Sequence, residues 1–142
     1  MSLPIGRVVL LFAAITTLSA CGKSDKFPVA QVEGCVKCNG VPVTAGLVVF
    51  VPTGGGDEKS DETGRSASGI IKPDGTYELT TYTDGDGAIV GPHTVEVFAP
   101  ALVDDDSPLT DANRYVCGKN PVQKTVEQGG NVIDLELTTK KR

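Results

Sequence analysis

The chain has 142 residues, of which 18 are acidic and 13 basic, giving a formal net charge of −5 at pH 7. It has four Phe, three Tyr and no Trp, so it offers few stacking platforms for sugars or bases, and no basic stripe is present, which argues against binding to nucleic acid. A single histidine, His93, limits the acid–base chemistry available to an enzyme, and we expect no catalytic residues and no cofactor.

Residues 1–20 have the layout of a bacterial secretory signal peptide. Arg7 supplies a positive charge, and the apolar run 8–15 is shorter than the roughly 20 residues that span a bilayer but typical of a signal-peptide core. Leu18-Ser19-Ala20-Cys21 follows and resembles a lipobox, so we expect Cys21 to become the lipidated first residue of an exported protein. An ordinary signal peptide cleaved near Ala20 is the alternative.

A lipid on Cys21 would hold the protein at a membrane of the cell envelope, since each buried CH₂ of an acyl chain contributes about 0.8 kcal/mol. Gly22 follows the cysteine in place of the Asp that retains lipoproteins in the enterobacterial inner membrane. We therefore expect either the outer membrane or the periplasmic face of the inner membrane. Residues 21–29 would be a lipidated tether, 30–138 the folded domain and 139–142 a basic tail.

The region 30–138 alternates apolar and polar residues, with Gly, Pro, Asn and Asp between the runs. Asn39-Gly40 and Pro73-Asp74-Gly75 indicate tight turns, and Gly129-Gly130 predicts a hairpin between the last two strands. Seven short strands in this length predict an all-β, seven-stranded β-sandwich. The expected strands are residues 30–38, 47–51, 66–71, 76–81, 93–98, 122–127 and 131–137.

Three blocks of turn glycines and alternating apolar residues carry a resemblance to a known family. They are Gly34-x-Val36 with Gly40-x-Pro42-Val43 and Gly46-x-Val48-x-Phe50-x-Pro52, then Gly69-x-Ile71-x-x-Asp74-Gly75-x-Tyr77-x-Leu79, then Asp86-Gly87-Ala88 with Gly91 and Val95-x-Val97. The chain resembles a carboxypeptidase regulatory-like (transthyretin-like, prealbumin-like) domain over residues 31–137, and with its lipobox it is similar to small lipoproteins of planctomycete-type bacteria. The resemblance implies a transthyretin-like or Ig-like sandwich with Tyr77 as a core aromatic.

The same resemblance bears on activity. The hydroxyisourate hydrolases of this fold need several histidines and a C-terminal Tyr-Arg-Gly-Ser signature, which this chain lacks. Related Gram-positive surface domains join a Lys to an Asn by an isopeptide bond, for which Lys37 and Asn131 would be the candidates, although Asn131 adjoins the Gly129-Gly130 turn.

Cys35, Cys38 and Cys117 remain after lipidation, and in an oxidising compartment we expect one disulfide that joins Cys35 or Cys38 to Cys117. Alternation places Val32, Gly34, Val36 and Cys38 on one face of the first strand, with Glu33, Cys35 and Lys37 on the other. A zinc site formed by the three cysteines and His93 is the competing hypothesis, but the usual second closely spaced ligand pair is missing.

Two acidic loop segments offer oxygen ligands for calcium, Asp84-Gly85-Asp86 and Asp104-Asp105-Asp106. Neither completes the EF-hand spacing, and acidic runs of this kind are more commonly solvated loops than metal sites. We therefore expect no metal site.

The sequence as a whole predicts a non-enzymatic, lipid-anchored envelope lipoprotein that serves as a structural or protein-interaction module. The alternative is a ligand-binding module that recognises carbohydrate or peptide through loops 82–92 and 100–121. Its partners would be the membrane and either envelope proteins or glycans, and the sequence leaves the oligomeric state open.

Overall fold

The computed structural model describes residues 27–54, 64–100 and 114–139. The signal peptide, Cys21, most of the tether and the basic tail beyond residue 139 lie outside these ranges, as does the Asp104-Asp105-Asp106 segment. Within the described ranges, no helix reaches the length and apolarity that crossing a bilayer requires.

The elements with described bounds are strands, which confirms the expected all-β class. They are β1 (Val29–Ala30), β2 (Val32–Cys38), β3 (Val41–Pro42), β4 (Leu47–Pro52), β5 (Ala67–Ile70), β6 (Thr76–Glu78), β7 (Ala88–Ile89), β8 (Gly91–Phe98), β9 (Val122–Val126), β10 (Asn131–Val132) and β11 (Leu135–Leu137).

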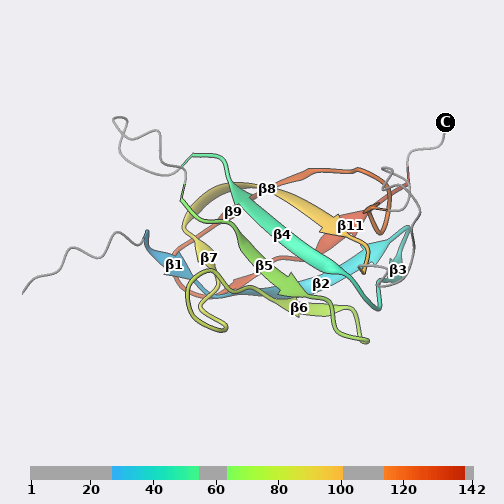
Figure 1. Ribbon diagram of the computed structural model, residues 1–142, viewed down its shortest axis with the longest axis horizontal. Helices are drawn as coiled ribbons and strands as arrows, with labels where there is room; N and C mark the ends of the chain where they lie inside the picture. The colour runs from blue at the N-terminus through green and yellow to red at the C-terminus, as the bar shows by residue number, and fades with distance from the viewer. Residues whose placement is uncertain (1–26, 55–63, 101–113, 140–142) are drawn as a thin grey trace, which may run out of the picture.

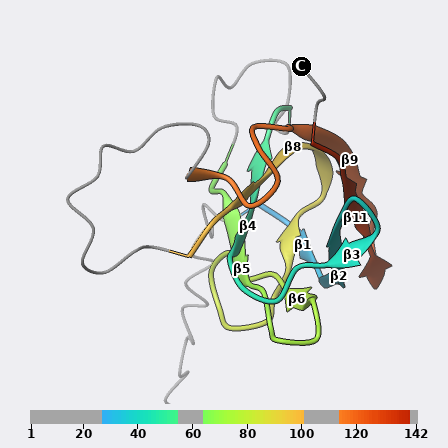
Figure 2. The same cartoon turned by 90° about the vertical axis from the view of Figure 1, so that its right-hand side faces the viewer.

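These strands form three sheets (Figure 1). One is antiparallel, in the order β5-β4-β8-β9. The second is built around β2, which pairs in parallel with β10 and β11 on one side and antiparallel with β3 and β6 on the other. The third is the short pair β1 and β7. In the end view of Figure 2, β4 and β5 lie on one side of the molecule, and β2 and β11 lie on the other.

Buried side chains from the two larger sheets belong to one hydrophobic core. Val32, Val36 and Leu135 come from the sheet around β2, and Phe50 and Val95 come from the sheet around β4 and β8. The alternation in β2 is as expected, because Val32 and Val36 are buried while Glu33 is exposed. Period-two alternation in a strand places one set of side chains on the core face, which explains why these strands form here.

The expected number of seven strands is wrong, because eleven lie within the described residues. The first expected strand is divided at Gln31. Before this residue β1 pairs with β7, and after it β2 pairs with β6, β10 and β11. The last is divided at residues 133–134, and the two-residue strands β3 and β7 were not expected. Such short pairings depend on what lies beside them and leave no periodic pattern in the sequence.

Two expected turns are confirmed. Asn39 and Gly40 have φ values of 51° and 82°, as a two-residue turn with both central residues left-handed requires, and they join β2 to β3. Gly75 has φ of 86°, and its N–H donates to the carbonyl oxygen of Lys72 at 2.8 Å.

The expected hairpin between the last two strands is wrong. β9 pairs with β8, whereas β10 and β11 pair with β2, so the Gly129-Gly130 turn carries the chain from one sheet to the other. A Gly-Gly turn permits a sharp reversal but does not choose the partner of the strand that follows.

Candidate functional site along the β2 seam

Several of the residues singled out in the sequence lie along the parallel pairing of residues 32–38 with residues 131–137, which we call the β2 seam. The register is constant, with Asn131 opposite Val32 at one end and Leu137 opposite Cys38 at the other. The Ile133 N–H donates to the Glu33 carbonyl oxygen at 2.8 Å, between β10 and β11. The seam therefore runs the full length of β2.

One step of this ladder is altered around Gly34. The carbonyl oxygen of Ile133 accepts a hydrogen bond of 2.5 Å from the hydroxyl of Tyr77, which is buried in the core as expected. A Cβ atom on Gly34 would collide with the same carbonyl group. Only glycine leaves room for this approach, which gives the Gly34-x-Val36 pattern a packing role.

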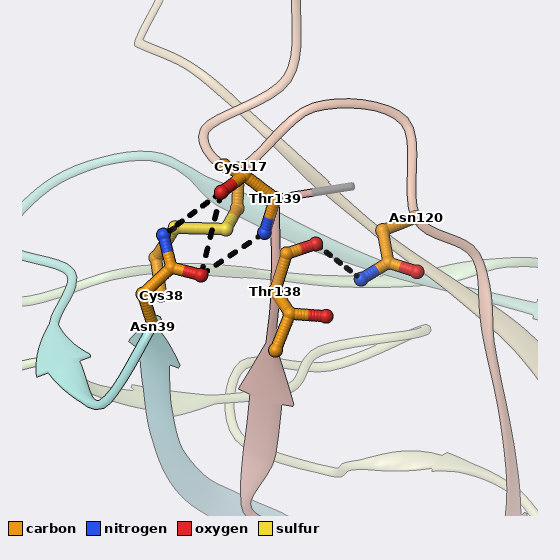
Figure 3. Close-up of a disulfide and its surroundings, with 6 residues drawn as sticks. All are labelled: Cys38, Asn39, Cys117, Asn120, Thr138 and Thr139. Atoms are coloured by element: carbon orange, nitrogen blue, oxygen red, sulfur yellow. Dashed lines mark hydrogen bonds between the residues drawn. A yellow bond between two sulfur atoms is a disulfide. The ribbon is translucent and has the colours of Figure 1, made fainter. Parts of the chain in front are cut away.

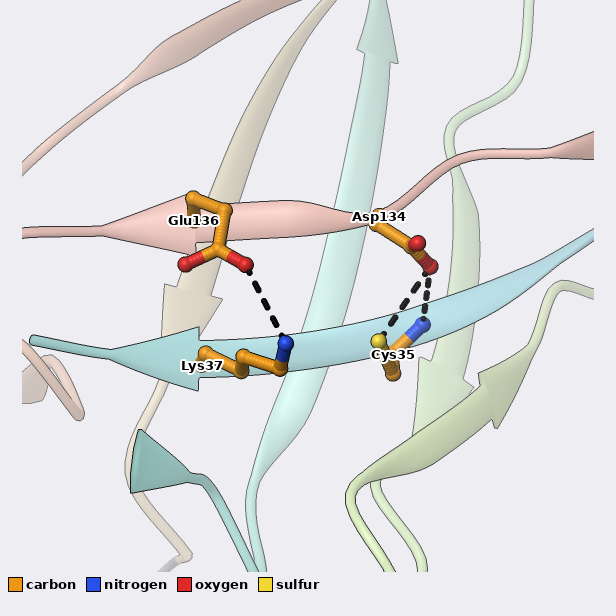
Figure 4. A network of polar contacts seen from close by, with 4 residues as sticks. All are labelled: Cys35, Lys37, Asp134 and Glu136. Carbon is orange, nitrogen blue, oxygen red and sulfur yellow. Dashed lines mark hydrogen bonds and ion pairs between the residues drawn. The ribbon is translucent and has the colours of Figure 1, made fainter. Parts of the chain in front are cut away.

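The side chain of Asp134 completes the ladder at this step (Figure 4). A regular parallel ladder would direct the Cys35 N–H to the Ile133 carbonyl. Here that N–H donates to Oδ1 of Asp134 at 3.0 Å, and the Cys35 thiol donates to the same oxygen at 3.2 Å. Sequence reasoning did not single out Asp134; the one local signal is that an Asp within a strand pattern is unusual, which marks the position but not its role.

These bonds set the ionisation of both side chains. The hydrogen bonds from the backbone N–H and then from the thiol of Cys35 hold the pKa of Asp134 below its ordinary value. The hydrogen bond to Asp134, with partial burial and the charge of the carboxylate, raises the pKa of the Cys35 thiol. Because the thiolate is the reactive form, this arrangement makes Cys35 a poor nucleophile.

Lys37 and Glu136 flank this feature on the same face (Figure 4). Lys37 Nζ lies 3.4 Å from Glu136 Oε1, and the two side chains are 40% and 63% exposed. An ion pair that is this exposed to water contributes about 0–1 kcal/mol.

The isopeptide candidates Lys37 and Asn131 are not brought together, because they lie five residues apart along the seam. The Asn131 side-chain amide instead donates to the carbonyls of Glu127, Gln31 and Gly129.

The disulfide lies at the far end of the seam and joins Cys38 to Cys117, with a Cα–Cα distance of 5.8 Å (Figure 3). The structure thus selects Cys38 over Cys35, which has a free thiol. Beside the disulfide, Asn39 and Thr139 are joined by side-chain and backbone hydrogen bonds, and Asn120 donates to the Thr138 carbonyl. The residues that follow β11 are therefore fastened to the turn that follows β2.

The zinc hypothesis is incompatible with this pairing, because the sulfurs of Cys38 and Cys117 are bonded to each other. Within the described ranges, no group of three or more His, Cys, Asp or Glu side chains is placed to hold a metal ion.

His93 lies inside β8 rather than at the start of a strand as expected, and only 1% of it is exposed. Its ring is 5.7 Å from that of Phe50, Nδ1 lies 2.9 Å from the Gly91 carbonyl oxygen, and Nε2 is buried with no hydrogen-bond partner. Desolvation lowers the pKa of His93, although the contact with the Gly91 carbonyl opposes this. His93 is therefore a neutral core residue at pH 7.

The carboxylate of Asp86, a calcium candidate, is used within its own loop. It accepts hydrogen bonds of 2.7, 2.9 and 2.9 Å from the backbone N–H groups of Thr81, Tyr82 and Thr83. Partial burial raises the pKa of Asp86, but these bonds together outweigh it and hold the pKa below its ordinary value. The oxygens that a cation would need are thus engaged in shaping the turn.

Shallow grooves lie next to the seam. One, of about 330 Å³, is bordered by Glu33 and Asn131. Another, of about 400 Å³, is bordered by Cys35, Tyr77, Glu78 and Asp134. A third, of about 540 Å³, lies beside the disulfide and is mostly apolar, with Val41 and Tyr115 on its walls. Cys35 and Asp134 meet at the wall of the 400 Å³ groove, where their hydrogen bond raises the pKa of the thiol, and His93 is enclosed in the core and borders none of these grooves.

Comparison with known proteins finds a likeness among solved structures. No protein-family model and no curated protein matches the chain. A crystal structure of a DUF3823 family protein from Parabacteroides merdae is similar, with a TM-score of 0.42 and 19% sequence identity over 80% of this chain. The match spans 48% of that protein's length.

Proposed function

We propose that this chain is a lipid-anchored lipoprotein of the cell envelope whose domain is a non-enzymatic structural or protein-interaction module. The observation that carries the proposal is the Cys38–Cys117 disulfide. Structural disulfides persist in oxidising compartments and are rare in the cytosol, so the disulfide agrees with the export that Leu18-Ser19-Ala20-Cys21 predicts. Two independent parts of the chain thus support a location outside the cytoplasm.

We also propose that the domain is a transthyretin-like β-sandwich of the carboxypeptidase regulatory-like type. Two multi-stranded sheets that share one hydrophobic core support this architecture. The motif residues Gly34, Gly75 and Tyr77 have structural roles here, as the resemblance implies.

The use of the polar side chains supports a module without catalytic chemistry. Asp134 and Asp86 bond to backbone N–H groups, and Asn131 bonds to backbone carbonyls. Of the two groups of greatest chemical interest, Cys35 has a raised thiol pKa and His93 is enclosed in the core. Hydrogen bonds of this kind hold turns and strands in place, which is the role of a scaffold.

Metabolic labelling tests the anchor. In cells fed labelled palmitate, the wild-type protein should incorporate label and partition with membranes, and globomycin should cause the unprocessed form to accumulate. The Cys21→Ser variant is the matched control and should remain unlabelled. Equal labelling of both proteins would refute lipidation at Cys21.

A glycan array with the purified protein tests the role of the domain. A structural module should give no saturable signal, whereas specific, saturable binding to one glycan class would refute the proposal in favour of a ligand-binding module.

A further inference from the structure

The two sides of the β2 seam leave the domain at opposite ends. β2 and β11 run in the same direction, as their arrows show in Figure 4. β1, which precedes β2, lies at the left of Figure 1, whereas β3 and the end of β11 lie at the right. A pull that separates the two ends of the domain therefore acts along the seam, drawing β2 one way and β11 the other.

This geometry loads the seam in shear. The hydrogen bonds run across the pulling direction, so they share the force and must fail together instead of opening one after another. They include Asn131 N–H to the Gln31 carbonyl at 2.9 Å, Cys35 N–H to Asp134 at 3.0 Å and Asn39 N–H to the Leu137 carbonyl at 2.8 Å.

Core packing resists the same motion. The side chains of Val32, Val36, Leu135 and Leu137 project from the two sides of the seam into the core, and each is at most 3% exposed. Sliding β2 past β11 would move these side chains out of their packed positions and expose apolar surface, at about 25 cal/mol per Å². The seam thus combines shared hydrogen bonds with buried apolar contacts.

At the end of the seam, the disulfide limits how far the chain can extend if the seam fails. It joins Cys38, the last residue of β2, to Cys117, which is 79 positions further along the chain. Strands β3 to β8 all lie between these two residues. If the seam failed, force would pass through the disulfide, and this segment would be excluded from stretching.

We propose that the domain is a tension-bearing link between its N-terminal end and the end that carries the disulfide. The proposal rests on the proposed function, because a lipid on Cys21 is what would fix the N-terminal end at a membrane. Force applied at the opposite end is then borne first by the seam and afterwards by the Cys38–Cys117 bond.

Single-molecule pulling of the full chain in two directions tests the seam. Cys21→Ser prevents acylation, and Cys35→Ser leaves Cys38 and Cys117 as the only native cysteines. Handles at the two chain ends load the seam in shear. In the control, one handle stays at the N-terminus and the other is attached through Gly130→Cys, where a Cβ meets nothing within 4 Å. Residue 130 adjoins Asn131, which lies opposite Val32, so this pull opens the seam from one end.

The end-to-end pull should require a several-fold higher unfolding force than the control pull at the same loading rate. Forced unfolding reports the unfolding barrier along the pulling direction, so the difference isolates the geometry. Equal forces in the two directions would overturn the proposal. Because the protein used has no lipid, this result is independent of the palmitate experiment, and either proposal can fail alone.

The length released in the end-to-end pull tests the disulfide. Reduction should lengthen the unfolded chain by about 270 Å, from 79 residues at about 3.4 Å each. An identical released length in oxidised and reduced protein would show that the force does not bypass β3 to β8 and would refute the limit set by the disulfide.

Discussion

Reduction of the Cys38–Cys117 disulfide should produce a large loss of stability. The bond closes a loop with a sequence separation of 79, which removes about 15 cal/mol/K of entropy from the unfolded chain, or about 4.5 kcal/mol at 25 °C. Single domains have unfolding free energies of about 5–15 kcal/mol, so the cross-link accounts for a substantial share.

The folded state itself should change little on reduction. Cys117 is buried, and Cys38 packs against the same core, where a reduced thiol behaves as a small apolar group. Hydrogen bonds between Asn39 and Thr139 still hold the end of the seam. The loss should therefore arise mainly in the unfolded state.

Urea unfolding of the oxidised and reduced forms of one protein measures the effect. The Cys21→Ser/Cys35→Ser background prevents exchange with other thiols. Cys35→Ser alone is the control for the loss of the Cys35 thiol, since Ser retains a hydrogen-bond donor for Asp134. Reduction should lower the unfolding free energy by about 4–5 kcal/mol and raise the denaturant slope, because the unlinked chain exposes more surface. A difference below about 1 kcal/mol would refute the reasoning.

Three further substitutions test the core and the seam. Gly34→Ala should lower the unfolding free energy in urea by about 1–3 kcal/mol or more, because its Cβ collides with the Ile133 carbonyl. Folding lowers the pKa of His93, so at pH values near its ordinary pKa of 6.5 the unfolded chain binds more protons than the folded protein. The unfolding free energy should therefore fall as the pH drops through 6.5. His93→Leu should abolish that slope in thermal unfolding. Asp134→Ala should cost about 1 kcal/mol and lower the pKa of the Cys35 thiol, measured as faster alkylation at a fixed pH.

Each substitution has a matched control. Gly130→Ala, at an open site with no left-handed φ, should leave stability nearly unchanged, and an equal loss at both glycines would contradict the packing argument. The Asp86 carboxylate loses its hydrogen bonds only below its ordinary pKa of 3.8, so that acid loss should persist in His93→Leu. A pH dependence of stability near 6.5 that also persisted in His93→Leu would disprove the role of His93 in it. Glu136→Ala should leave alkylation of Cys35 nearly unchanged, and an effect as large as that of Asp134→Ala would point to general charge instead of the specific hydrogen bond.

The strands and tight turns could be predicted because their causes are local. Alternation of apolar residues determines which side of residues 32–38 is buried, and that pattern is readable along the chain. Asn39-Gly40 turns where expected because its backbone conformation depends on those two residues. The role of Asp134 could not be read this way, since it depends on a carbonyl that Tyr77 engages from another strand.

The sequence by itself determined the all-β class, the buried faces and the set of cysteines able to form a disulfide. Only the tertiary structure decided that Cys38 pairs with Cys117 and that residues 131–137 lie parallel to β2 instead of forming a hairpin with β9. Cys35 and Cys38 are three residues apart, and the choice between them depends on which one the packed sheets bring within reach of Cys117. Strand partners and disulfides depend on distances between segments remote in sequence, and core packing fixes those distances.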